Sequence, residues 1–251
     1  MTGRISEIFT SIQGEGIYVG TPMVFVRFSG CNLQCDYCDT AESRSIVNGE
    51  IKTVSEIVSS IEKEIDQSKN VSIISFTGGE PLLHVETILE IISRFKKKGA
   101  ISAPLYSSKR RTFDLQVGGG IKTYLDTNGT LCEEFSKIID SIDYVAMDIK
   151  LPSSCPQEYW REHLEFLKIA KKKVFVKIII TSKSTDNEFK KAVEIIANVD
   201  ASIPLVIQPV TPIKNVNTMS FKRTCSLKKL AKAKLKNVSI IPQIHKKLGI
   251  R

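Results

Sequence analysis

The chain has 251 residues, of which 42% are hydrophobic and 25% charged, a composition typical of a folded globular protein. No segment approaches about 18 unbroken apolar residues, and no apolar stretch follows a basic N-terminus. We therefore expect neither a membrane span nor a secretory signal and place the protein in the cytoplasm. Lys and Arg number 36 against 27 Asp and Glu, a formal charge of +9; basic runs such as 96–98 and 222–236 are typical of solvated helix faces.

The first predicted elements are a strand and a helix. Residues 22–30 are rich in aromatic and β-branched side chains and end at a Ser-Gly pair, which predicts a buried strand. Thr53 and Glu56 have the spacing of a capping box, and apolar residues follow on one helical face. We therefore expect a helix over about 54–67.

From residue 71 onward, strands and helices alternate. An apolar run at 71–76 breaks at Thr77-Gly78-Gly79-Glu80-Pro81 and leads into a periodic stretch at 85–95, which predicts a strand, a glycine loop and a helix. This order implies a parallel sheet with right-handed crossovers, either open or closed into a barrel. The alternation recurs at 121–126 and 132–140, at 143–149 and 156–170, and at 173–180 and 186–197, before a strand near 203–209 and a basic helix at about 225–235.

Residues of unusual type follow the predicted strands. In parallel folds the loops at the carboxyl ends of the strands gather at one rim, where ligands bind. We therefore expect the ligand site at this rim, on the loops at 31–40, 77–81, 126–129, 148–150 and 208–211. One irregular segment, about 99–120, lacks periodicity, and we interpret it as an exposed insertion in a single domain spanning residues 1–251.

Three of the six cysteines, Cys31, Cys35 and Cys38, fall within eight residues. Without a secretory signal, such a cluster indicates metal binding or redox chemistry rather than disulfides. Three thiolates can hold an iron-sulfur cube and leave one iron open, as a catalytic centre requires, whereas structural zinc would need a fourth Cys or His. We expect the remaining cysteines, which match no such motif, to be structural thiols: Cys132, Cys155 and Cys225.

The segment 31–38 has the C-x3-C-x2-C signature of the radical S-adenosylmethionine (radical SAM) superfamily, and 77–81 resembles the glycine-rich loop of that superfamily. The resemblance implies an α/β fold, a partial or modified (βα)6 barrel of the radical SAM type. Most of the chain is also similar to the family of 7-carboxy-7-deazaguanine synthases. The segments that carry this narrower resemblance are 7–16, 25–27, 30–33, 38–40, 127–129, 148–150, 208–210 and 241–246.

The resemblance implies a carbon-nitrogen lyase. In this family a 4Fe-4S cluster cleaves S-adenosylmethionine to a 5′-deoxyadenosyl radical, which abstracts hydrogen from 6-carboxy-5,6,7,8-tetrahydropterin. The ring then contracts with loss of ammonia, and 7-carboxy-7-deazaguanine forms for queuosine or archaeosine biosynthesis. The resemblance further implies Mg²⁺, a one-electron reductase of flavodoxin or ferredoxin type and a homodimer, without membrane or direct nucleic-acid contact.

Three residues have both a ligand interpretation and a simpler one. Arg27 shares a strand face with Met23 and Phe25 and suits a substrate carboxylate, or else makes an internal salt bridge. The resemblance implies that Thr40 ligates Mg²⁺ together with the substrate, which completes the octahedron; otherwise Thr40 caps a short helix. By position His245 is expected to contact the substrate, or else to be an ordinary surface or packed histidine.

The resemblance assigns further ligand contacts to the rim loops. The glycines among them have the alternative of simply forming turns. For S-adenosylmethionine the residues are Tyr37, Cys38, Asp39, Gly79, Glu80, Asp148, Ile149, Lys150, Gln208, Pro209, Val210 and Thr211. For the substrate they are Ile12, Gln13, Gly14, Glu15, Arg27, Thr77, His245 and Arg251.

Two other functions are compatible with parts of the sequence. An activating enzyme that installs a glycyl radical on a partner protein would share the cysteine spacing but would leave Gln13 and Arg27 unexplained. A zinc-stabilised RNA-binding module would use the charge of +9, but the chain has only 7% aromatic residues and no recognition motif.

Overall fold

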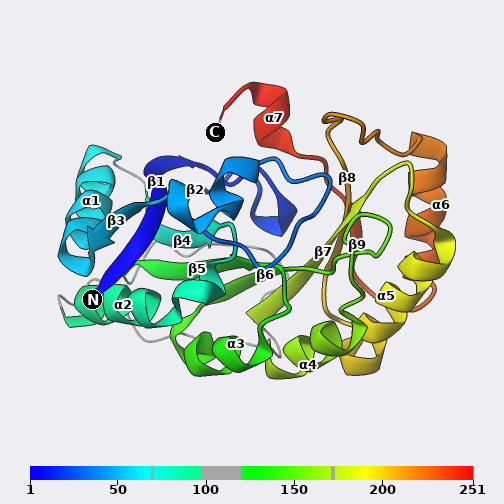
Figure 1. Cartoon of the computed structure of the whole chain (residues 1–251). Helices are drawn as coiled ribbons and strands as arrows, with labels where there is room; N and C mark the ends of the chain where they lie inside the picture. The colour runs from blue at the N-terminus through cyan, green and yellow to red at the C-terminus, as the bar shows by residue number, and fades with distance from the viewer. Residues whose placement is uncertain (69–70, 98–119, 171–172, 251) are drawn as a thin grey trace.

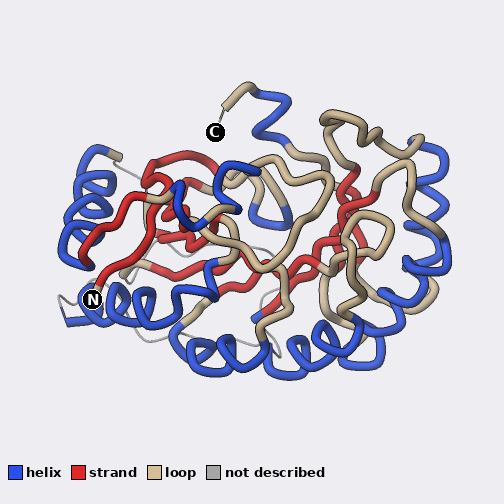
Figure 2. The backbone as a smooth tube through the Cα atoms, viewed as in Figure 1, coloured by secondary structure: helices blue, strands red, loops and turns tan. Residues whose placement is uncertain are grey.

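One curved sheet of nine strands runs through the part of the chain that the computed structural model describes, which is residues 1–68, 71–97, 120–170 and 173–250. The strand order is β3-β1-β2-β4-β5-β6-β7-β8-β9, and the sheet does not close on itself within these residues. Helices cover the convex side of the sheet (Figures 1 and 2). The predicted insertion at 99–120, except for Gly120, and Arg251 lie outside the described residues.

The N-terminal edge of the sheet is antiparallel, which the predicted alternation of strands and helices did not indicate. β1 (Thr2–Ile12) pairs with both β2 (Pro22–Phe28) and β3 (Glu50–Thr53), and neither β1 nor β3 was predicted. A short connection joins β1 to β2, and only antiparallel strands can be linked in this way. The Phe9 and Phe25 rings stack across this pair with centroids 5.2 Å apart.

The rest of the sheet is parallel, as the alternation of strands and helices predicted. From β2 onward each strand pairs in parallel with the next in the order, a partial barrel. The strands are β4 (Ile73–Gly78), β5 (Lys122–Thr127), β6 (Tyr144–Asp148), β7 (Val174–Ile180), β8 (Leu205–Pro209) and β9 (Val238–Ile240).

The predicted helices are present, with shifts at some ends. Thr53 and Glu56 form the capping box that starts α1, and Thr185 and Glu188 form another before α5. Ser220 caps α6 five residues before its expected start at Cys225, because its hydroxyl accepts a hydrogen bond from the Arg223 N–H. The helices are α1 (Val54–Gln67), α2 (Val85–Lys97), α3 (Cys132–Ile138), α4 (Trp160–Ala170), α5 (Asp186–Asp200), α6 (Phe221–Lys232) and α7 (Ile244–Leu248).

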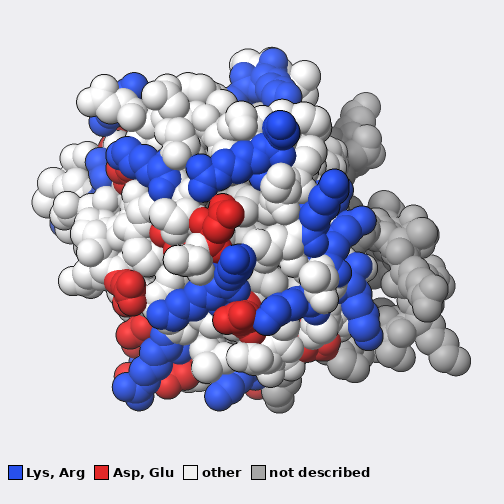
Figure 3. Space-filling model, turned by 90° about the vertical axis from the view of Figure 1, so that its right-hand side faces the viewer, with Lys and Arg blue, Asp and Glu red and all other residues white. Residues whose placement is uncertain are grey.

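The basic run 222–236 lies on a solvated face. Figure 3 shows Lys and Arg spread over the side of the molecule that carries α6, with acidic side chains between them. Lys222, Lys229, Lys232, Lys234 and Lys236 are exposed there, as expected of a solubilising surface. None of the helices in the described residues has the length and apolarity to cross a membrane.

Inward-facing side chains form layers inside the curve of the sheet, because alternate residues of a strand point to the same side. The first layer is apolar and consists of Met23, Ile73, Tyr124, Ala146, Phe175 and Val206. Two residues further along each of these strands comes what we call the second layer: Phe25, Ser75, Asp126, Asp148, Lys177 and Gln208. Two residues beyond that, at the rim, stand Arg27, Thr77, Asn128, Lys150, Ile179 and Val210.

Candidate active site

A cavity of about 520 Å³ opens at the carboxyl ends of the strands, where the sequence predicted a ligand site. All three clustered cysteines line it, together with residues from β1, β2, the loops after the parallel strands and α7. The predicted ligand residues on its wall are Ile12, Gln13, Gly14, Glu15, Arg27, Cys31, Cys35, Tyr37, Cys38, Asp39, Thr40, Thr77, Gly79, Asp148, Lys150, Val210 and His245.

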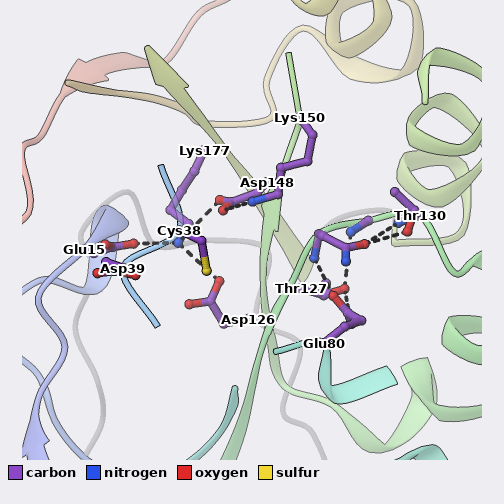
Figure 4. Close-up of polar contacts among 12 residues, drawn as sticks. Glu15, Cys38, Asp39, Glu80, Asp126, Thr127, Thr130, Asp148, Lys150 and Lys177 are labelled. Carbon is purple, nitrogen blue, oxygen red and sulfur yellow. Dashed lines mark hydrogen bonds and ion pairs between the residues drawn. The ribbon is translucent and has the colours of Figure 1, made fainter. Parts of the chain in front are cut away.

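Five predicted cofactor residues do not line the cavity: Glu80, Ile149, Gln208, Pro209 and Thr211. Glu80 is fully buried and accepts hydrogen bonds from the Leu82 N–H (3.0 Å), the Thr127 hydroxyl (2.8 Å) and the Asn128 N–H (2.8 Å) (Figure 4). Burial raises the pKa of Glu80 to about 7, although these hydrogen bonds act to lower it. The Glu80 carboxyl therefore joins the loops after β4 and β5.

Glycines bring the loop after β4 against the cysteine loop. A Cβ on Gly78 would lie 2.1 Å from the Phe28 carbonyl oxygen, and one on Gly79 would lie 2.1 Å from that of Gly30. The Glu80 N–H donates to the Gly30 carbonyl at 2.7 Å, directly before Cys31. The glycine pair therefore makes a backbone contact that no side chain would permit, and that contact orients the first cysteine.

Cys155 is a neighbour of the cysteine loop that no sequence motif indicated. Cys155 is buried in one apolar cluster with Leu33, Cys35 and Tyr37, and the Asp36 N–H donates to the Ser154 carbonyl at 3.1 Å. A hydrogen bond from the Cys155 thiol lowers the pKa of Cys35 to about 6, which favours the thiolate that binds metal. The two cysteines are far apart in the sequence, so no spacing signal connected them.

Arg27 makes the internal salt bridge that the sequence offered as one interpretation, and its position leaves the ligand interpretation open. Its Nε lies 2.8 Å from Glu7 Oε1, the internal salt bridge, and its guanidinium lies 5.5 Å from the centroid of the Phe9 ring. Its terminal nitrogens have no hydrogen-bond partner within the described residues, and the side chain lines the cavity. A planar fork with free donors suits a carboxylate.

A charged cluster surrounds Lys177 of the second layer (Figure 4), and neither Lys177 nor its partner Asp126 was among the predicted site residues. Lys177 Nζ lies 2.7 Å from Glu15 Oε2, 3.2 Å from Asp126 Oδ1 and 3.4 Å from Asp148 Oδ1. Lys150 Nζ binds the other oxygen of Asp148 at 2.8 Å. A lysine in the middle of the apolar run Val174–Ile180 was the available signal, because a buried lysine requires a partner.

The pKa values of the two aspartates of this cluster shift in opposite directions. Burial raises the pKa of Asp126 to about 6, although the charge of Lys177 opposes the rise. Burial acts on Asp148 in the same direction, but the charges of Lys150 and Lys177 outweigh it, and the pKa of Asp148 is lowered. Of the two aspartates, Asp126 therefore gains a proton more readily.

The C-terminal segment closes one side of the cavity at Asp39. His245 Nε2 lies 3.8 Å and Lys246 Nζ 3.4 Å from Asp39 Oδ2. Burial would raise the pKa of Asp39, but the hydrogen bond from His245 and the charge of Lys246 hold it well below its usual range. A Cβ on Gly14 would overlap the His245 ring, so glycine is required where α7 meets the loop after β1.

Glu15, Asp39 and His245 place metal-ligating atoms within 4.8 Å of one another. Their oxygens already have partners, because Gln243 Nε2 donates to Glu15 Oε1 at 2.7 Å and Lys177 and Lys246 neutralise the carboxylates. We therefore interpret this group as the contact that joins the C-terminal segment to the rim.

The donor set of the cavity fits an iron-sulfur cluster and a polar ligand beside it. The three thiols stand on one wall, and no fourth Cys side chain lines the cavity within the described residues. In the second layer Gln208 is fully buried, and neither polar atom of its amide has a partner within the described residues; the same holds for the Ser75 hydroxyl. Buried polar atoms without partners are costly, but neither residue lines the cavity, so the fit to a cluster rests on the three thiols.

Comparison with known proteins identifies the class. The family model of the radical SAM superfamily matches residues 25–196. The crystal structure of QueE from Escherichia coli covers 96% of this chain and 94% of its own with a TM-score of 0.60 at 19% identity. A radical SAM methyltransferase from Sphaerobacter thermophilus has a TM-score of 0.62 at 11% identity, over 88% of this chain and 66% of its own. The chain belongs to the radical SAM superfamily, whose enzymes use a 4Fe-4S cluster and S-adenosylmethionine.

Full-length relatives narrow the assignment. The 7-carboxy-7-deazaguanine synthase of Geobacter sulfurreducens is 31% identical over 98% of this chain and 97% of its own length. Those of Methanocaldococcus jannaschii and Archaeoglobus fulgidus are each 32% identical, over 98% and 100% of this chain and 99% and 100% of their own lengths. The chain belongs to the family of 7-carboxy-7-deazaguanine synthases.

Proposed function

We propose that this protein converts 6-carboxy-5,6,7,8-tetrahydropterin into 7-carboxy-7-deazaguanine with loss of ammonia, in 7-deazapurine biosynthesis. The observation that carries the proposal is that one cavity combines the three cluster thiols with an arginine fork and a carboxylate-rich floor. The relatives that match the whole length of the chain support the same reaction.

The substrate side of the cavity matches a flat, carboxylated ring. Phe9 and Phe25 both line it and offer apolar ring faces, beside which Arg27 binds the substrate carboxylate through its terminal nitrogens. Gln13, Glu15 and Asp126 supply hydrogen-bonding groups for the ring nitrogens. Holding the ring between these groups fixes the carbon that loses hydrogen relative to the cluster wall.

The cofactor side is formed by the cysteine loop and the loops after β4 and β6. Cys31, Cys35 and Cys38 would hold the 4Fe-4S cluster, and Gly79, Asp148 and Lys150 would contact S-adenosylmethionine. When bound, these groups supply the radical chemistry, while the protein excludes water and orients the reactants. The remaining predicted cofactor contacts stay part of this proposal.

We propose Mg²⁺ binding at Thr40. Thr40 occupies the N-cap position of the 3-10 helix Ala41–Arg44, but its hydroxyl makes no capping bond, and the residue lines the cavity. A single hydroxyl holds Mg²⁺ only when substrate oxygens and waters complete the octahedron. Binding of Mg²⁺ should therefore depend on the substrate.

The proposal includes the partners that such a reaction requires. A one-electron reductase of flavodoxin or ferredoxin type would supply the electron, and the chain would act as a homodimer. We take residues 1–251 as one radical SAM domain.

Anaerobic reconstitution tests the function. The protein is loaded with iron and sulfide, reduced, and incubated with S-adenosylmethionine and 6-carboxytetrahydropterin, with and without Mg²⁺, and deazaguanine is measured by mass spectrometry. We expect a brown protein that forms product and forms it faster with Mg²⁺. Cleavage of S-adenosylmethionine without any deazaguanine would favour a glycyl-radical activating enzyme, and a colourless zinc protein would exclude both enzymes.

A further inference from the structure

All hydrogen-bond donors of Lys177 are used within the protein. A protonated lysine has three N–H donors, and Glu15, Asp126 and Asp148 each present one oxygen to Nζ (Figure 4). The side chain is only 3% exposed. Lys177 therefore has no donor left for a ligand, and any influence that it has on a ligand passes through the three carboxylates.

The three carboxylates are compensated unequally. Asp148 has a second cation in Lys150, and Glu15 has the Gln243 amide as an additional donor. For Asp126 the structure gives Lys177 as its ion-pair partner within the described residues, and 24% of its side chain remains exposed to the cavity. Three carboxylates against two ammonium groups leave one negative charge, which is least compensated at Asp126.

We propose that Lys177 is a positioning residue that holds Glu15 and Asp126 as a pair of acceptors for the N–H groups of a bound ring and holds Asp148 beside Lys150 on the cofactor side. The inference rests on the proposed function, because the aminopyrimidinone part of a pterin presents an exocyclic amine and ring N–H groups. A pair of carboxylate acceptors favours such an edge over a ring edge that carries only acceptors.

The register of the sheet explains why the lysine stands at position 177. Asp148 on β6 is the direct neighbour of Lys177 on β7, and Asp126 on β5 faces inward in the same layer. Glu15 reaches Nζ from the loop between β1 and β2, across the curve of the sheet. One side chain thus joins the substrate wall to two central strands.

The test compares Lys177→Met with wild type in the reconstituted enzyme and measures KM and kcat for the carboxypterin and the Kd for S-adenosylmethionine. We expect KM for the carboxypterin to rise about tenfold or more, because Glu15 and Asp126 lose the ammonium group that holds them in position to accept the hydrogen bonds of the ring. The Kd for S-adenosylmethionine should rise only about threefold, because Lys150 still holds Asp148. Lys173→Met is the matched control: this lysine precedes the same strand and donates to the Ile139 and Ile142 carbonyls, away from the cavity. Its KM should stay at the wild-type value.

A charge-balanced pair of variants separates positioning from folding. Lys177→Met with Asp126→Asn leaves the same net charge in the cluster as wild type, so it should fold even where Lys177→Met alone does not. We expect its KM to exceed that of Asp126→Asn alone by about tenfold. Equal KM values for these two proteins, or wild-type KM and cofactor Kd in folded Lys177→Met, would overturn the inference. Failure of the proposed function would give a different result, because the wild-type protein would then make no deazaguanine. In that case the Kd for S-adenosylmethionine, compared between wild type and Lys177→Met, would still test the role of Lys177.

Discussion

The cysteine loop and the charged cluster around Lys177 face the same cavity but are assembled in opposite ways. The three cysteines fall within eight consecutive positions of one loop, whereas Lys177 meets Glu15 across 162 residues of sequence and meets Asp126 and Asp148 through the pairing of the strands. The loop needs local spacing, and the cluster needs the completed sheet. Loss of one ligand in the loop should therefore abolish the chemistry, whereas changes in the cluster should alter affinity by degrees.

The largest effect is expected from the loop. Cys38→Ala should lose the cluster and with it all detectable product, because three thiolates are the minimum that holds such a cube in this loop. Its melting temperature without iron should match that of the iron-free wild type, since the side chain lies on the cavity wall. Iron content, product formation and thermal melting measure the effect.

Cys225→Ala is the control for this variant, because Cys225 lies on α6 and outside the cavity. Its iron content and activity should equal those of wild type. A Cys38→Ala protein that kept its iron and its product would remove the distinction between the two regions.

The next largest effect is expected at Arg27, which belongs to neither region. Variants of Arg27 and of its partner Glu7 distinguish a role in binding the substrate from a role in the internal salt bridge. Arg27→Ala should raise KM for the carboxypterin about 100-fold with a smaller change in kcat, the loss of a bidentate charge-assisted contact. Glu7→Gln removes the salt bridge but keeps the fork, so its KM should stay within about threefold of wild type. If Glu7→Gln raised KM as much as Arg27→Ala, the pair would act as a structural unit.

The same contrast explains what the sequence predicted. Local signals were sufficient for α1 and α5, whose capping boxes and apolar faces are complete within a few residues, and for the cysteine loop. The carboxyl-end rule predicted the rim as the ligand site, and most of the predicted site residues on the rim loops line one cavity there. Each of these inferences needed only spacing or strand order.

What the sequence did not predict depends on contacts between distant segments. β3 has four residues and β9 three, too few for a period to be recognised, and both form by pairing with a neighbour already in place. Lys177 and Cys155 acquire their surroundings from strands and loops that no motif connects to them. Glu80 was assigned to the cofactor because its motif is local, yet its carboxyl joins two loops.

The pH dependence of turnover tests the charged cluster. The pKa of Asp126 is raised from its ordinary 3.8 to about 6, so its ionisation costs folding stability that is regained as pH falls from about 6 towards 3.8. Substrate binding has the opposite sign if the carboxylate accepts N–H groups: kcat/KM should fall about tenfold per pH unit below about 6. Asp126→Asn should have a lower kcat/KM than wild type at neutral pH, and its kcat/KM should not show this decline below about pH 6. If Asp126→Asn showed the same decline, the decline would belong to another titrating group.

The smallest effect is expected at Cys155. It tests whether the cysteine loop holds the cluster without help from a residue that is distant in the sequence. Cys155→Ala should retain the cluster and keep activity within about threefold, but it removes a thiol donor from Cys35, so the reduction potential of the cluster should become more negative. Redox titration followed by electron paramagnetic resonance measures this shift. Cys132→Ala, whose thiol donates to the Glu162 carbonyl, is the matched control and should leave the potential unchanged. Iron loss as complete as in Cys38→Ala would instead make Cys155 a ligand, and the loop would then depend on the folded sheet as strongly as Lys177 does.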